Sequence, residues 1–143
     1  MTANPMLTLS ESREPRADAV IRQGLAGYNT DRFRPSDNTI LDVLVRDDSS
    51  GEVLGGLLGH TSYCLLFLDV FYLPEELRSA GLGSRIIALA EDEARRRGCT
   101  ATFVYTVTFQ APGFYERHGS RRFGAVVCPP DGATRIFFSK PLA

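Results

Sequence analysis

The chain has 143 residues, 43 % of them hydrophobic, and a formal net charge of −1. That length and apolar content suit a single domain over residues 1–143 with a core of its own. The near-zero charge excludes the strongly basic surface typical of nucleic-acid binding, and no apolar run is long enough to cross a bilayer, so we expect neither nucleic-acid nor membrane partners.

The first part of the chain predicts a strand, a helix and a loop. Met6 to Ser10 alternates weakly between apolar and polar residues, as a short strand would. Glu14 and Pro15 then open a helix from Arg16 to Tyr28, whose apolar residues fall on one face. Asn29 to Asn38 is polar and reads as a loop, which either overhangs a binding site or simply connects two elements on the surface.

Three strands are predicted next. Thr39 to Arg46 and Val53 to Thr61 flank a polar turn and should form an antiparallel hairpin. Tyr63 to Tyr72 is apolar on both faces, which is typical of a central strand covered by helices on both sides. Asp69 interrupts this apolar run, and a carboxylate there must be paired, hydrogen-bonded or functional.

The second half of the chain predicts two helices and three strands. Leu82 to Arg97 has an apolar stripe at helical spacing, and acidic residues stand four positions before its arginines. Thr100 to Thr108 should lie parallel to the central strand. A short helix is expected over Gln110 to His118, followed by an antiparallel pair, Arg121 to Cys128 and Thr134 to Lys140. This order predicts an α+β protein built on a mixed sheet.

The N-terminus and the cysteines bear on the compartment. The first ten residues lack the basic and apolar regions of a signal peptide. Cys64, Cys99 and Cys128 are odd in number and widely spaced, which fits neither a disulfide framework nor a metal-binding motif. We therefore expect a cytoplasmic protein with reduced thiols and no bound metal.

The stretch from Arg78 to Gly83 lies between the central strand and the longest predicted helix. Its two glycines allow backbone N–H groups to converge where the helix N-terminus adds partial positive charge, and phosphate suits that place. The alternative is that the glycines serve only the geometry of the turn. Ile86 occupies the third glycine position of a dinucleotide fingerprint, so that motif is excluded.

Two motifs together resemble the GNAT N-acetyltransferases. Arg78 to Gly83 matches the family's R/Q-x-x-G-x-G/A loop, and Phe114 to Gly119 matches its F-Y-E-x-x-G segment. The resemblance covers Val53 to Phe138. It implies a GNAT fold, in which a mixed sheet of six to seven strands is flanked by helices. The sheet is expected to splay apart between the central strand and its parallel neighbour.

The resemblance also implies an activity and a binding site. The family transfers an acetyl group from acetyl-CoA, its cosubstrate, to a primary amine of a small molecule or peptide by direct attack in a ternary complex. The residues that match the family's pyrophosphate loop are Arg78, Ser79, Ala80, Gly81, Leu82, Gly83 and Ser84. Arg78 either adds charge to this loop or closes it structurally. Phe71, Tyr72 and Leu73 would offer backbone groups to pantetheine, with an N–H near Phe71 or Tyr72 as oxyanion donor.

Two residues are candidates for proton transfer. Tyr115 matches the family's general acid, which protonates the departing sulfur; the alternative is a half-buried packing aromatic. Asp69 is the candidate base or amine ligand, unless it is only a structural hydrogen-bond acceptor. His118, near a helix end, is more typical of a C-terminal helix partner than of a base. The family often has Asn where this chain has Thr108, and Phe where it has Ser120.

Other functions and an assembly state follow from the same residues. A GNAT-like module that binds acyl-CoA without catalysis is the main alternative. A cysteine-nucleophile acyltransferase is a weaker one, since no cysteine is directly flanked by a histidine or an acid in sequence, and only a pairing in space would supply one. The apolar final hairpin, Arg121 to Lys140, predicts an edge strand that is covered in a homodimer.

Overall fold

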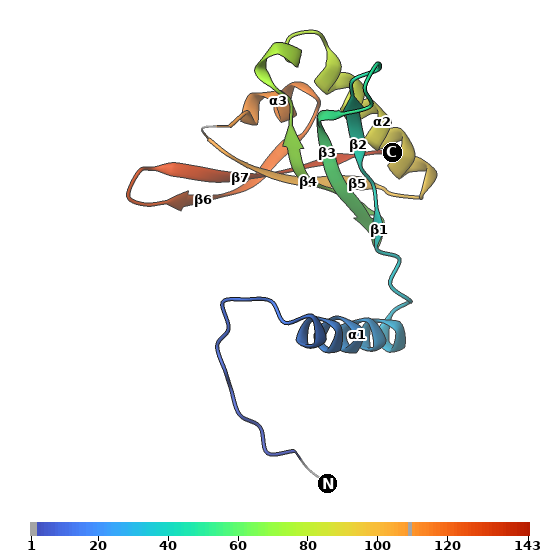
Figure 1. The fold of residues 1–143 in the computed structure, drawn as a ribbon, viewed down its shortest axis with the longest axis vertical. Coiled ribbons are helices and arrows are strands. Elements are labelled where there is room, and N and C mark those ends of the chain that lie inside the picture. The colour runs from blue at the N-terminus through green and yellow to red at the C-terminus, as the bar shows by residue number, and fades with distance from the viewer. Residues whose placement is uncertain (1–2, 109) are drawn as a thin grey trace. The chain divides into compact units, whose positions relative to one another are not determined.

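The computed structural model describes residues 3–108 and 110–143. The chain divides into two compact units, Met1–Ser36 and Asp37–Ala143. The first contains one helix, and the second contains the sheet with the remaining helices (Figure 1).

The first unit is built around α1 (Pro15–Arg32). Pro15 starts the helix, and Asp18 in the first turn is held by Arg22 and Arg13. The helix runs past Tyr28, because the polar residues that follow it continue the helical hydrogen bonding as far as Arg32. Every residue of α1 is at least partly exposed. The predicted strand at residues 6–10 is wrong: no described strand pairs with this segment, so its backbone has no ladder.

The second unit is a seven-stranded sheet in the order β1-β3-β4-β5-β7-β6, with β2 also paired to β3. Only β4 and β5 are parallel to each other; the other strand pairs are antiparallel. The strands are β1 (Thr39–Ile40), β2 (Val43–Arg46), β3 (Val53–Ser62), β4 (Leu65–Tyr72), β5 (Ala101–Val107), β6 (Arg121–Cys128) and β7 (Ala133–Pro141). The predicted mixed α+β sheet is confirmed.

The predicted strand from Thr39 to Arg46 is split into β1 and β2 around Asp42. There the Asp42 carboxylate accepts from the Gly59 N–H at 3.2 Å, and the Leu41 N–H donates to the Gly59 carbonyl at 3.0 Å. A side chain at Gly59 would lie 2.5 Å from the Phe67 carbonyl oxygen. Glycine therefore allows three strands to approach one another at this point.

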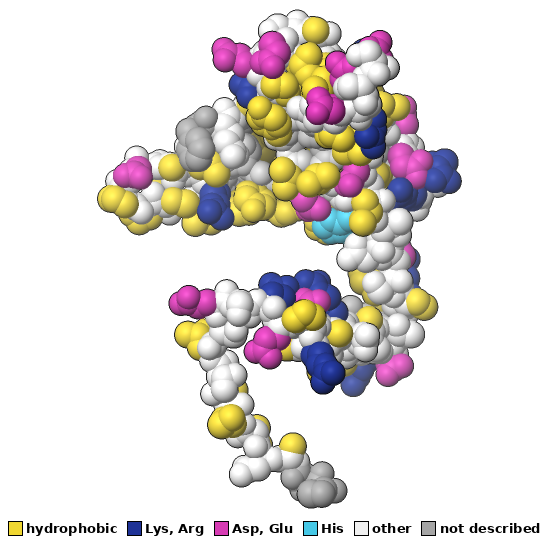
Figure 2. All heavy atoms as spheres, in the orientation of Figure 1, with side chains coloured by type: hydrophobic (Ala, Val, Ile, Leu, Met, Phe, Trp, Pro, Cys, Tyr) yellow, Lys and Arg dark blue, Asp and Glu magenta, His cyan; other side chains and the backbone are white. Residues whose placement is uncertain are grey.

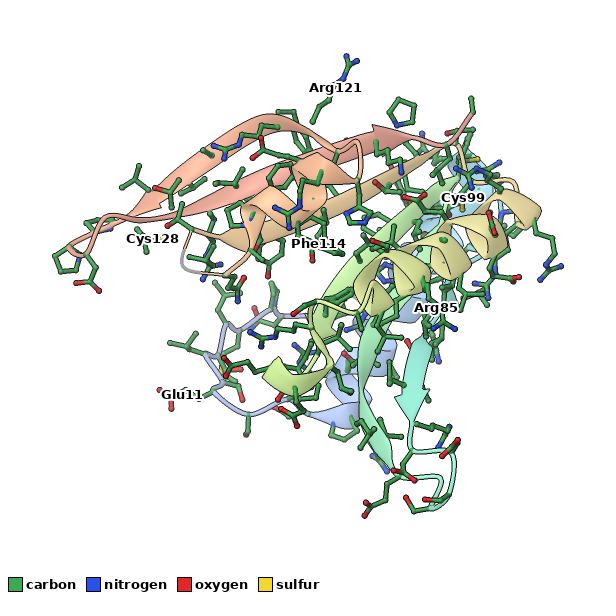
Figure 3. The ribbon with its side chains drawn as sticks, turned by 90° about the horizontal axis from the view of Figure 1, so that it is seen from above. Glu11, Arg85, Cys99, Phe114, Arg121 and Cys128 are labelled. Carbon is green, nitrogen blue, oxygen red and sulfur yellow. The ribbon has the colours of Figure 1, made fainter. Side chains whose placement is uncertain are left out.

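Two helices pack on one face of the sheet and form the core. These are α2 (Leu82–Arg96) and α3 (Pro112–Arg117), and a 3₁₀ turn, η1 (Glu75–Leu77), precedes α2. Figure 3 shows both helices in front of the same side of the sheet. The apolar stripe of α2 supplies Ile86, Ile87, Ala90 and Ala94 to a core that includes Leu57, Leu66 and Phe138. That stripe was predicted from helical spacing and is confirmed.

Within unit 2 the other face of the sheet has no described helix on it, so the expectation of helices on both faces is wrong there. Aromatic side chains cover one another instead: Phe103 contacts Phe67, Phe123 and Phe137. The same face exposes Ile40, Leu58, Val70, Tyr72, Tyr105 and Phe123. Among the described residues, no helix has the length and apolar character needed to cross a membrane.

Candidate active site

The two parallel strands part half-way along their length. Leu65–Leu68 pairs with Ala101–Val104, yet β4 continues to Tyr72 and β5 to Val107. Beyond Leu68 each strand stays paired only on its outer side, β4 with β3 and β5 with β7. Among the described residues, the backbone groups of both strands that face the gap have no strand partner, and only those of Val107 are taken, by Gln110. The others are available to a ligand.

A β-bulge in β4 lies where this gap begins. Leu58 pairs with Val70 and Gly59 pairs with Leu68, which leaves Asp69 as the extra residue. Bulges of this kind re-aim side chains and are frequent beside active sites. Asp69, predicted as the base, is therefore placed at the point where β4 leaves β5.

The Asp69 carboxylate contacts a residue that the sequence analysis did not single out. Asp69 Oδ2 lies 2.6 Å from His60 Nδ1. The His60 ring is stacked on Phe67, with centroids 4.5 Å apart and planes within 3° of parallel. The turn at Tyr63–Cys64, both at positive φ, sets a hairpin register that pairs His60 with Phe67. Asp69 is then diagonal to His60, so recognising this hairpin would have found the pair.

The loop before α2 presents unpaired amides. Ser79 and Gly81 have φ of 71° and 75°, and Gly81 is the N-cap of α2. The first turn of α2 has no acidic residue and no side-chain cap; its first backbone acceptor, the Gly81 carbonyl, receives the Arg85 N–H. The N–H groups of Leu82, Gly83 and Ser84 are thus available to an anion, and the helix dipole and Arg85 favour negative charge there.

The remaining loop residues hold this arrangement in place. Arg78 Nε donates to the Leu73 carbonyl at 2.9 Å, so its guanidinium closes the loop. Leu73 is buried, whereas Tyr72, at the end of β4, is exposed. Ser79 and Ala80 are exposed at the tip of the loop, and Leu82 packs against the core.

Two contacts fasten α2 to α3. Gly83 packs on the Phe114 ring, and a Cβ built on Gly83 would lie 2.9 Å from an atom of that ring. Phe71 also packs on the Phe114 ring, with the two ring centroids 5.6 Å apart. His118 Nδ1 donates to the Phe114 carbonyl at 2.7 Å, because a carbonyl can only accept. Its Nε2 then accepts from the Ser84 hydroxyl at 2.7 Å. Both nitrogens of His118 are engaged, in keeping with a structural helix-end partner.

Tyr115 lies on α3 and is buried against Phe114 and Phe138. Burial raises the pKa of the Tyr115 phenol above its ordinary value of 10.0. Among the described residues its hydroxyl has no hydrogen-bond partner, and that oxygen is not completely buried. A neutral phenol in this setting is chemically able to donate a proton to a ligand atom at neutral pH.

The two positions that depart from the family motif have structural roles. The Thr108 N–H donates to the Thr134 carbonyl, and the Thr134 N–H donates to the Thr108 hydroxyl oxygen. These two hydrogen bonds tie the end of β5 to β7. The Ser120 N–H donates to the Tyr115 carbonyl at 3.0 Å, just after α3. Phe123 lies on the sheet face away from α3, against Phe103 and Phe137, so it does not supply the aromatic missing at Ser120.

The cysteines are poorly placed for acyl transfer at this gap. Burial, with a smaller contribution from the neighbouring Cys64, raises the pKa of the Cys99 thiol and so disfavours its thiolate. Cys64 precedes β4, and the whole eight-residue strand separates it from the end near α2. Cys128 ends β6, at the edge of the sheet.

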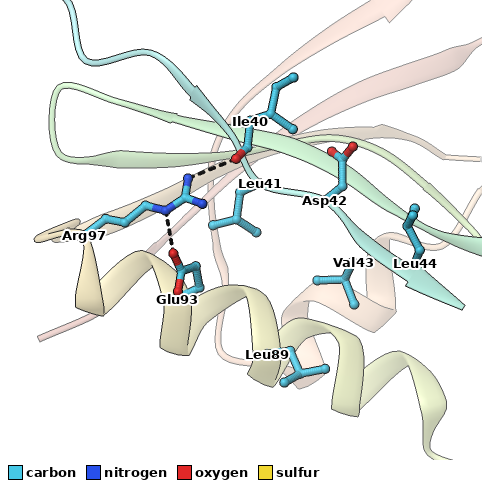
Figure 4. Close-up of a pocket in the computed structure, with 8 residues that line it drawn as sticks. All are labelled: Ile40, Leu41, Asp42, Val43, Leu44, Leu89, Glu93 and Arg97. Atoms are coloured by element: carbon cyan, nitrogen blue, oxygen red, sulfur yellow. Dashed lines mark hydrogen bonds and ion pairs between the residues drawn. The ribbon is translucent and has the colours of Figure 1, made fainter.

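Two hollows lie near the C-terminal end of α2 rather than at its loop. One of about 440 Å³ is bounded by β1, β2 and α2 (Figure 4). A second, of about 280 Å³, shares Arg97 with it. Arg97 donates to the Ile40 carbonyl at 3.1 Å and to Glu93 at 2.8 Å, and these bonds fix the end of α2 to β1. Neither hollow is lined by a predicted site residue, and we place no part of the chemistry there.

A model of the acetyltransferase (GNAT) family matches residues 7–120. The chain belongs to the GNAT acetyltransferase family. An acetyltransferase of Agrobacterium fabrum is 36 % identical over 118 residues, covering 82 % of this chain and 85 % of the relative. Blasticidin-S acetyltransferase of Streptomyces morookaense is 44 % identical over 93 residues, covering 64 % of this chain and 68 % of the relative. A crystal structure from Agrobacterium tumefaciens has a TM-score of 0.88 at 33 % identity, covering 96 % of this chain and 99 % of that chain.

GNAT membership makes this chain an acetyl-CoA-dependent acyltransferase, as the two motifs predicted. The loop fits the pyrophosphate of that cosubstrate. A Cβ at Gly81 would meet no atom within 4 Å, so the space beside it is open to a phosphate. The amides of Leu82, Gly83 and Ser84 would be the donors to that phosphate. The pantetheine amides of the same cosubstrate would meet the backbone groups that face the gap between β4 and β5.

Proposed function

We propose that this chain transfers the acetyl group of acetyl-CoA to a primary amine by direct attack in a ternary complex. The observation that carries the proposal is the parting of β4 from β5 after Leu68 and Val104, beside the loop from Arg78 to Gly83. This arrangement supports a phosphate site next to a run of backbone groups that no strand pairs with. An activated thioester and an amine can then meet without a covalent enzyme intermediate.

Each step has a residue assigned to it. Backbone amides at the start of α2 hold the pyrophosphate, and bound acetyl-CoA supplies the activated acetyl group. A backbone N–H of Phe71 or Tyr72, facing the gap, stabilises the oxyanion. Tyr115 donates its proton to the departing sulfur, since burial keeps the phenol protonated.

We propose a small basic molecule as the acceptor. The support is that blasticidin-S acetyltransferase is 44 % identical over 93 residues. That span of similarity makes blasticidin S the first acceptor to test. We further propose that the protein acts in the cytoplasm and forms a homodimer through the exposed edge strand β6, where Phe123, Val126 and Val127 are exposed.

An acceptor panel tests this function. Purified protein is mixed with acetyl-CoA and, in turn, with blasticidin S, a polyamine, and a peptide with a free N-terminus and a lysine, while released thiol is measured. We expect the highest kcat/KM with blasticidin S or another small basic amine. Tight acetyl-CoA binding with no amine-dependent thiol release would instead support a non-catalytic acyl-CoA-binding module.

A further inference from the structure

His60 and Asp69 lie on the sheet face opposite α2 and α3. His60 pairs with Phe67, and the Phe67 ring joins Phe103 on the face that α2 does not cover. Figure 2 shows histidine atoms next to hydrophobic and acidic side chains in the unit that contains the sheet. The gap between β4 and β5 begins at Asp69. The pair therefore lies at one mouth of the gap, while the loop from Arg78 to Gly83 precedes the helix on the other face.

The hydrogen bond between the two side chains fixes the imidazole tautomer. An ionised carboxylate can only accept, so the 2.6 Å contact makes His60 Nδ1 the donor and Asp69 Oδ2 the acceptor. In the neutral ring this leaves a lone pair on Nε2. Among the described residues nothing bonds to that nitrogen. Stacking on Phe67 holds the ring plane, so Nε2 has a defined position.

The other histidine provides an internal comparison. His118 uses both ring nitrogens, one on the Phe114 carbonyl and one on the Ser84 hydroxyl. Within the described part of the chain, only Nδ1 of His60 is bonded, to the Asp69 carboxylate, and Nε2 stays open. The His60 side chain is 29 % exposed. A carboxylate that orients a histidine while its far nitrogen stays open is the arrangement of a general base.

We propose that His60, oriented by Asp69, is the base that accepts the proton of the acceptor amine, an inference that rests on the proposed function. Asp69 is then a positioning residue. The amine nitrogen bonds to the acetyl carbon, and the C–S bond breaks. One amine proton passes to His60 Nε2, and the Tyr115 proton passes to sulfur. His60 then releases its proton to solvent and Tyr115 regains one, so the net products are the acetamide and the CoA thiol.

The His60→Gln variant is the direct test, because glutamine keeps polar bulk but has no basic nitrogen. We expect kcat with blasticidin S, or with whichever panel amine is acetylated, to fall by roughly 10²–10⁴-fold, the usual range for a lost general base. The Kd for acetyl-CoA, measured by calorimetry, should stay within about twofold. Ser62→Ala, on the same face of β3 but away from the gap, is the control and should keep full kcat.

The role of Asp69 has its own readout. Nitrogen-15 NMR of the imidazoles should show the His60 proton on Nδ1; there are only two histidines, so His60→Gln assigns the signals. Asp69→Asn should lower kcat and mix the tautomers, and Asp69→Glu should restore part of both. A His60 proton on Nε2, or full kcat in His60→Gln, would overturn the inference while leaving the acetyltransferase intact. A parent protein that acetylates no amine in the panel would instead remove the proposed function, and the role of His60 with it.

Discussion

At the scale of single residues, Tyr115 is the donor whose loss should be most informative. Tyr115→Phe keeps the ring that packs on Phe114 and Phe138 and removes only a hydroxyl with no described partner. We expect kcat to fall by roughly 10²–10⁴-fold, with thermal stability and acetyl-CoA affinity nearly unchanged. Stopped assays with direct product detection measure this. Full kcat in the variant would make Tyr115 a packing aromatic.

The same residue predicts a pH dependence. The pKa of Tyr115 is raised above 10.0 by burial, so the folded state holds the proton more tightly than the unfolded chain. Its stabilising contribution is fully present below the unfolded value of about 10 and is lost as pH rises through the folded pKa. The melting temperatures of the parent and of Tyr115→Phe, plotted against pH, should therefore have the same slope near neutrality. The two plots should differ in slope only above about pH 10, where the parent loses the contribution of the phenol. Any difference in slope near neutrality would contradict this account.

Gly81 tests the phosphate loop, and the chain offers a matched control. Gly81 and Gly98 lie at opposite ends of α2, with φ of 75° and 85°, and neither has an atom within 4 Å of a built Cβ. Gly81→Val and Gly98→Val should each lose about 1–2 kcal/mol of stability, from strain at positive φ. Only Gly81→Val should weaken acetyl-CoA binding in calorimetry, by tenfold or more. Equal weakening in both variants would mean that strain, not phosphate approach, matters.

At the scale of elements, the C-terminal end of α2 is fixed to β1 by an acid–arginine pair. Hydrogen bonds from Arg96 and Arg97 lower the pKa of Glu93 to about 2. A depressed folded pKa means that this contribution is present above the unfolded value of about 4.5 and is lost as pH falls toward 2. Glu93→Gln should thus melt earlier than the parent at pH 7 but not at pH 2. Asp92→Asn, at an exposed pair with Arg95, is the control and should change little.

The elements also show where sequence reasoning succeeded and where it did not. Sequence patterns within a few residues predict three features: helical spacing predicts the apolar stripe of α2, β-branched residues predict β6, and paired glycines predict the loop from Arg78 to Gly83. The division of β1 from β2 depends on a side-chain bond from Asp42 to a distant strand, which no local pattern reveals. His60 was missed for the same reason, because its meaning depends on the register across the Tyr63–Cys64 turn.

At the scale of the whole molecule, the exposed edge of the sheet predicts how two copies of the chain assemble. β6 is an edge strand, and Val126 on it is 55 % exposed. We expect a dimer in light scattering at high concentration and a shift to monomer for Val126→Lys, since an edge lysine blocks strand addition. Val53→Lys is the control, because Val53 is 54 % exposed on a different strand. A parent protein that stays monomeric would remove the homodimer proposal.

Acetyl transfer to an amine is the central activity proposed for this protein. The most direct measurement is the stoichiometry of one reaction, in which blasticidin S and acetyl-CoA are incubated with the protein and both products are quantified. We predict that thiol release and acetamide, identified by mass spectrometry, appear in equal amounts. Thiol release with free acetate and no acetamide, with this and every other amine tested, would contradict the claim and leave only a hydrolytic side reaction on a bound thioester.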